Sequence, residues 1–193
     1  MRKLGIIAVL SLMALALAAV PALAAGEHFT KQGFPKCTIT GTTASTDRTV
    51  TCTSVLAGLG NEDLTTTTSG EGSVTYFCGA PGNGNLAAGQ NKSPATVSGG
   101  EPTVTPSPEF KNGKATATDS VILSAPAPSD VSPEEAGCQN DNWQVVGTGL
   151  SITEVTYTVE QGDVTLVECT RTGSNLQGSF TFKKSECTGP AVR

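Results

Sequence analysis

The feature that most constrains the fold is a repeated alternation of β-branched and polar residues. Val155, Tyr157 and Val159 alternate with Thr156 and Thr158, which places the larger apolar side chains on one face of an extended chain. A period of two residues with Val, Ile and Thr enriched is the pattern of a half-buried β-strand. The sequence therefore predicts strands rather than helices.

The same pattern recurs along the chain with turn residues between the segments. The expected strand regions are 37–41, 49–53, 64–68, 73–78, 114–123, 155–159, 164–170 and 180–182. We expect hairpins to join 37–41 to 49–53, and 64–68 to 73–78 through Ser69–Gly72, with a further turn over 173–178. Many short strands at such spacing predict an all-β fold, an antiparallel immunoglobulin-like β-sandwich with long loops rich in Gly, Pro and Asn.

The N-terminus has the pattern of a secretory signal peptide. Arg2 and Lys3 precede an apolar run from Leu4 to Val20, and Ala22-Leu23-Ala24 fits a cleavage site with small residues. We expect residues 1–24 to be removed, 25–36 to form a tail, and 37–190 to form one disulfide-braced domain. The mature chain would be secreted without a membrane anchor, and a bacterial exterior is the expected location.

The charge argues against two classes of partner. The formal net charge is −5, and loss of Arg2 and Lys3 takes it to −7. Because the sequence contains no run of basic residues, we expect no nucleic-acid partner and no binding to anionic membranes. An unknown protein or a cell-surface polymer is the expected partner.

Six cysteines lie beyond the expected cleavage site, and an even number in an exported chain predicts three disulfides. Six cysteines allow about fifteen pairings, and the sequence does not choose among them. In one arrangement Cys78–Cys138 ties two long loops to one end of the sandwich and Cys37–Cys52 braces the first hairpin. Cys169–Cys187 then remains to join the last strands.

Residues suited to catalysis are few, so we expect a protein that is not an enzyme and has no cofactor. His28 is the only histidine and lies near the expected mature N-terminus, where a catalytic base is improbable. Glu134, Glu135, Glu154, Glu160 and Glu168 leave open a hydrolase that uses paired carboxylates.

Metal sites are also weakly indicated. Asn61–Asp63 and Gln139–Asn142 are oxygen-rich, but Asn and Asp are equally typical of turns. Cleavage after Ala25 would expose Gly26-Glu27-His28, a nitrogen set suited to Cu(II). We predict no metal site.

Two loops are the candidate binding region, Gly79–Gln90 and Gln139–Asn142. The candidate residues are Asn83, Asn85, Gln90, Asn140, Asp141 and Trp143. An exposed Trp143 could stack on a sugar ring, whereas a Trp that begins a sandwich strand more often lies in the core.

Several turn and loop motifs carry a resemblance. Leu56–Leu64, Cys78 with its Gly/Asn/Pro loop, Lys111-Asn112-Gly113, and Cys138 with Asn142-Trp143 resemble uncharacterised secreted bacterial β-sandwich proteins. The resemblance implies an extracellular sandwich and no particular activity. The expected function is a secreted binding, structural or adhesive protein, with a soluble inhibitor-like binder or a carboxylate-dependent hydrolase as alternatives.

Overall fold

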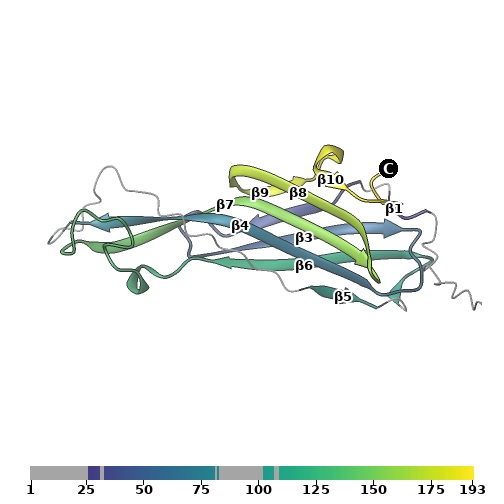
Figure 1. Cartoon of the computed structure of the whole chain (residues 1–193), viewed down its shortest axis with the longest axis horizontal. Helices are drawn as coiled ribbons and strands as arrows, with labels where there is room; N and C mark the ends of the chain where they lie inside the picture. Colours follow the sequence, from purple (N-terminus) through teal and green to yellow (C-terminus); the bar gives the residue numbers. More distant parts are fainter. Residues whose placement is uncertain (1–25, 31–32, 81, 83–101, 107–108) are drawn as a thin grey trace, which may run out of the picture.

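The computed structural model describes residues 26–30, 33–80, 82, 102–106 and 109–193, and these form ten strands in two antiparallel sheets (Figure 1). The prediction of an all-β protein is confirmed. The strands are β1 His28–Phe29, β2 Lys36–Thr40, β3 Asp47–Ala57, β4 Leu64–Gly79, β5 Thr103–Thr105, β6 Lys114–Ser124, β7 Gln144–Gln161, β8 Val164–Leu176, β9 Gly178–Thr181 and β10 Cys187–Thr188. Short 3-10 turns lie at Pro128–Asp130 (η2) and Lys184–Glu186 (η3).

The two sheets have different strand orders. In sheet A, β6 pairs with one edge of β3, and the other edge of β3 pairs with β1 and with β2, which in turn pairs with β9. Sheet B has the order β10-β8-β7-β4-β5. β1 falls within the segment expected to be a tail, so that segment contributes a short strand. No helix among the described residues is long and apolar enough to cross a membrane.

Alternation of side chains builds the core between the sheets. Along β6 every second side chain is buried, from Ala115 to Leu123, and the intervening side chains of Thr116, Thr118, Ser120 and Ile122 face solvent. Val50 and Cys52 of β3 and Val155, Tyr157 and Val159 of β7 are fully buried. The apolar positions identified from the sequence thus form the interior.

The first predicted hairpin is present, with Cys37 opposite Cys52 and Ile39 opposite Val50. The second is not. Residues 64–79 form one 16-residue strand, β4, that runs through the supposed turn at Ser69–Gly72 and pairs with β7 throughout. Gly70 and Gly72 serve close packing at a β-bulge, because a Cβ on Gly72 would lie 2.8 Å from the carbonyl oxygen of Ser151.

The turn predicted over 173–178 is also shorter than expected. β8 continues to Leu176, which lies opposite Ile152 of β7, and the chain then crosses to sheet A as β9. The guanidinium of buried Arg48 donates hydrogen bonds to the side chain of Asn175 (3.1 Å) and the carbonyl of Leu176 (3.1 Å). These contacts hold this segment in place, so its polar residues do not form a loop.

The molecule is elongated because β4 and β7 extend beyond the other strands as a two-stranded ribbon (Figure 1). β7 has 18 residues, whereas β3 and β6 have 11 each. At about 3.3 Å per residue β4 spans about 50 Å. We call the far end of this ribbon the tip. The described N-terminal residues and the C-terminus lie at the opposite end, which we call the base.

Three disulfides brace this frame. Cys37–Cys52 joins β2 to β3 and Cys169–Cys187 joins β8 to β10, each between residues that lie directly opposite one another. Cys78–Cys138 ties the end of β4 to the loop that precedes β7. These are the pairs of the arrangement considered from the sequence. Three disulfides indicate an oxidising, extracellular compartment.

Candidate functional site

The tip carries Cys78 and the loop Gln139–Asn142 that the sequence analysis singled out, whereas most of the other candidate loop, Gly79–Gln90, lies outside the described residues. Cys78 and Cys138, with Cα atoms 5.7 Å apart, hold the loop before β7 against the end of β4. Asn140 and Asp141 are exposed there. The backbone N–H of Asn142 donates to the Oδ1 of Asn140 (3.0 Å), and the N–H of Trp143 donates to the Asn140 carbonyl (3.1 Å). Asn140 therefore shapes its own turn.

The candidate residues divide between described and undescribed parts of the chain. Trp143 is partly buried and packs against the hydrophobic core, in line with the core interpretation of this side chain. Asn83, Asn85 and Gln90 lie outside the described residues. The structure brings Asn140, Asp141 and Trp143 to the same end as Cys78.

The carboxylates considered for hydrolysis are separated into two groups. Glu135 lies in the loop before β7 and accepts hydrogen bonds from the N–H (2.9 Å) and hydroxyl (2.8 Å) of Ser132, which lower the pKa of this carboxyl. Glu154 lies on the outer face of sheet B, directly opposite Glu71. Sequence analysis missed Glu71 because it stands in the supposed turn. None of these three glutamates lines the groove of sheet A that contains Lys36.

Among the described residues, no group of three or more His, Cys, Asp or Glu side chains could hold a metal ion. The Nδ1 atom of His28 is 2.5 Å from the carbonyl oxygen of Gly26, so this nitrogen donates to the backbone. Asn61–Asp63 belongs to the loop between β3 and β4, and Gln139–Asn142 lies at the tip. The two oxygen-rich loops are therefore separate in space.

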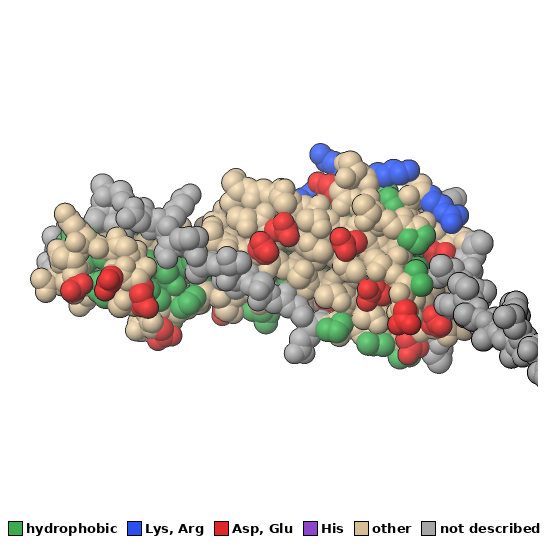
Figure 2. Space-filling view, viewed as in Figure 1, with side chains coloured by type: hydrophobic (Ala, Val, Ile, Leu, Met, Phe, Trp, Pro, Cys, Tyr) green, Lys and Arg blue, Asp and Glu red, His purple; other side chains and the backbone are tan. Residues whose placement is uncertain are grey.

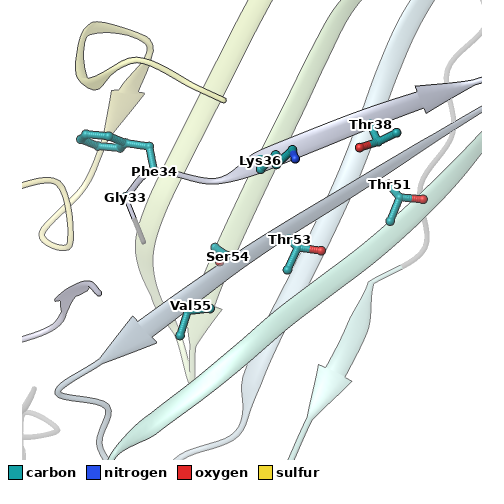
Figure 3. Close-up of a pocket in the computed structure, with 8 residues that line it drawn as sticks. All are labelled: Gly33, Phe34, Lys36, Thr38, Thr51, Thr53, Ser54 and Val55. Atoms are coloured by element: carbon teal, nitrogen blue, oxygen red, sulfur yellow. The ribbon is translucent and has the colours of Figure 1, made fainter. Parts of the chain in front are cut away.

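A groove of about 320 Å³ lies on the outer face of sheet A at the base (Figure 3). We call it the base groove, and its lining includes Phe34, Lys36, Thr38, Thr51, Thr53 and Val55. Figure 3 shows Lys36 and Thr38 on β2 and Thr51 and Thr53 on β3, with Phe34 at one end. The Phe34 ring contacts Phe29, with 5.2 Å between ring centroids, so it is held in position.

The outer face of sheet A presents hydroxyl groups in rows across the strands. One row is Ser179–Thr38–Thr51–Ser120 and the next is Thr181–Lys36–Thr53–Thr118. Neighbouring hydroxyls bond across strands, at 2.8 Å for Thr51–Ser120 and 3.0 Å for Thr53–Thr118. Strand geometry spaces such positions by about 4.8 Å across strands and about 6.7 Å along them. The result is a regular polar surface.

Charge differs between the two outer faces. Sheet B carries the exposed or partly exposed carboxylates Glu71, Glu154, Glu160 and Glu168. On sheet A the outward positions of β2, β6 and β9 carry no carboxylate, and β3 carries only Asp47, at the end away from the base groove. All the lysines in the described part of the chain lie at or beside the base end of sheet A: Lys36, Lys111, Lys114, Lys183 and Lys184.

Sequence reasoning missed this grouping because the lysines are scattered along the chain and only the sheet pairing brings them to one end. Figure 2 shows basic side chains along one edge near the C-terminus and acidic side chains over the rest of that face. Acidic residues also occur at the base: Glu62 and Asp63 lie in the loop that leads into β4, Asp163 lies in the turn between β7 and β8, and Glu109 lies beside Lys111 and Lys114 at the β6 edge of sheet A, away from the base groove. Glu186 is paired with Arg171 at 2.6 Å.

Comparison with known proteins found no matching family model, curated protein or solved structure. The resemblance drawn from the loop motifs therefore stays a prediction.

Proposed function

We propose that the protein is a secreted, non-enzymatic component of the cell exterior that works by binding. In this proposal residues 1–24 are a signal peptide that is removed, and the two sheets form an immunoglobulin-like sandwich. Because no cysteine among the described residues is free, the fold depends on an oxidising compartment for its covalent bracing.

The observation that carries the proposal is the arrangement of the elongated domain. Both ends of the described chain lie at the base, and the Cys78–Cys138 disulfide with the loop that precedes β7 lies at the tip (Figure 1). A domain held at one end presents its other end to a partner. The tether also reduces the conformational freedom that the tip loops would lose on binding.

The first test is the location and size of the mature chain in a fractionated culture of the producing cells. We expect a chain that begins near residue 25, has three intact disulfides, and is retained in the cell-wall or matrix fraction. A chain inside the cell with its N-terminus intact and its thiols reduced would overturn the proposal.

The second candidate function is a soluble binder that captures another protein with its tip loops. The disulfide at the root of these loops favours it, since a rigid loop binds with a smaller entropic cost. A free monomer in the culture medium, with none retained on cells, would replace the structural proposal with this one.

A further inference from the structure

We propose that the base groove binds an anionic polysaccharide, with Phe34, Lys36, Thr51 and Thr53 contacting consecutive acidic sugar units. This inference rests on the proposed function, because it names the ligand class through which the base would be retained at the cell exterior. The tip loops would then face outward.

The groove combines the groups that an acidic sugar requires. Threonine hydroxyls both donate and accept hydrogen bonds, as sugar hydroxyls do. The Lys36 ammonium supplies a charge-assisted bond to a carboxylate. Phe34 offers an apolar surface for the C–H face of a pyranose ring, and its contact with Phe29 fixes it before a ligand arrives.

Charge complementarity selects an anionic ligand. The whole chain is acidic, with a formal charge of −5, yet the base groove contains a lysine and none of its lining residues is acidic. Lys183 and Lys184 lie just beyond β9, after Phe182, and the N–H of Phe182 donates to the carbonyl of Pro35, next to Lys36. The carboxylates of sheet B repel a polyanion, so the ligand is directed to sheet A.

The hydroxyl rows favour a polymer over a small anion. Two neighbouring rows, Ser179–Thr38–Thr51–Ser120 and Thr181–Lys36–Thr53–Thr118, place donors and acceptors at intervals of about 4.8 Å across the strands and about 6.7 Å along them, and the next row ends at the exposed Ile122. A polysaccharide repeats its own hydroxyls, so successive sugar units meet equivalent partners beyond the groove. The Thr38–Ser179 pair, 2.9 Å apart, continues the surface to β9.

The experiment measures binding of the full mature chain to polygalacturonate by isothermal titration calorimetry, with neutral dextran and inorganic polyphosphate as comparison probes. We expect polygalacturonate to bind with an affinity that falls as ionic strength rises, dextran to bind at least about tenfold more weakly, and polyphosphate to bind more weakly than polygalacturonate. Equal binding of dextran, or stronger binding of polyphosphate, would overturn the assignment of an acidic sugar.

Matched variants localise the site. K36Q, F34A and T53V should each lower the affinity about threefold to tenfold. Their controls are K114Q at the other edge of sheet A, F77A on the ribbon, and T156V, whose hydroxyl bonds to that of Thr170 on sheet B at 3.1 Å. The controls should stay within about twofold of the parent chain.

The variants are compared only after circular dichroism and a thiol assay show that each is folded and oxidised. If K36Q and K114Q lowered the affinity for polygalacturonate equally, the overall positive charge rather than the groove would account for binding, and the proposal would be overturned. One outcome separates this inference from the proposed function. If the chain is retained in the exterior fraction but K36Q and F34A bind the polysaccharide as tightly as the parent chain, the proposed function stands and this inference is refuted.

Discussion

The carboxylate of Asp119 in sheet A accepts a hydrogen bond from the backbone N–H of Thr68 in sheet B at 2.5 Å. Asp119 points inward from β6, where it is 4% exposed, and its other oxygen accepts from the hydroxyl of Thr103 at 2.5 Å. Asp119 therefore accepts a hydrogen bond from a backbone N–H of β4 at a position past Thr66, where the pairing of β4 with β5 stops. An inward-pointing charge of this kind also protects a sheet edge from pairing with other chains.

Replacing Asp119 by Ala should destabilise the fold by about 1–3 kcal/mol, because the buried backbone N–H of Thr68 loses its acceptor, whereas the exposed Thr103 hydroxyl can bond to water instead. Urea unfolding monitored by circular dichroism measures the change. The matched variant is D163A, at the exposed turn between β7 and β8, which should cost less than about 0.5 kcal/mol. If D119A and D163A were equally stable, the hydrogen bond from Thr68 to Asp119 would make no measurable contribution to the free energy of unfolding.

The disulfides should differ in their contribution to stability. Cys78–Cys138 closes a sequence separation of 60 residues and Cys37–Cys52 one of 15. Since the entropy of the unfolded chain falls more when a longer loop is closed, C78A/C138A should lose about 1 kcal/mol more than C37A/C52A. Chemical unfolding of the two double variants under non-reducing conditions tests this order. A larger loss for C37A/C52A would contradict it.

Tyr157 should make stability fall at high pH. Its hydroxyl is buried, contacts the Ser54 hydroxyl at 2.8 Å and donates to the Ala117 carbonyl at 3.1 Å. Burial raises the pKa of Tyr157 well above its ordinary value of 10.0. Above about pH 10 the unfolded chain loses this proton while the folded chain keeps it. The free energy of unfolding should then fall by up to about 1.4 kcal/mol per pH unit.

The control for this effect is Y157F, which should show a shallower decline above pH 10. Some decline should remain, because burial also raises the pKa of Tyr76. Urea midpoints measured from pH 8 to 11 provide the comparison. Parallel curves for the two proteins would show that Tyr157 does not cause the loss.

Gly58→Ala should destabilise the base by about 2 kcal/mol or more. Gly58 has φ of 77°, which is unfavourable for a residue with a side chain, and a Cβ there would collide with the carbonyl of Gly26. Gly178 has φ of 63° but open space around it, so G178A should cost only about 1 kcal/mol. Thermal unfolding compares the pair, and equal losses would show that contact with the N-terminal segment is unimportant.

The strands that could be predicted are those in which alternation and turn residues agree. Thr alternates with apolar residues in β2, β3, β6 and β7, and Gly162-Asp163 separates β7 from β8. The strand and turn boundaries were predicted wrongly where glycine or polar residues pack against, or hydrogen-bond to, another element of the fold. Gly70 and Gly72 imitate a turn in the sequence, but they adjoin Leu123 and Ser151 in the folded chain.

The candidate site was only partly accessible to sequence reasoning. The candidate loops Gly79–Gln90 and Gln139–Asn142 could be chosen from their composition and from the cysteines beside them. The base groove could not, because Phe34 and Lys36 are separated from Thr51 and Thr53 by the turn between β2 and β3. No local motif marks a groove formed by residues that become neighbours through strand pairing.

The sequence by itself determined the all-β class, because side-chain alternation depends only on local strand geometry. It also determined that the cysteines would be paired in an oxidising compartment. Only the tertiary structure decided that the five lysines of the described residues gather at one end of sheet A while Glu71, Glu154, Glu160 and Glu168 face outward from sheet B. Such a distribution depends on sheet order and register, which are set by long-range packing of the two buried faces.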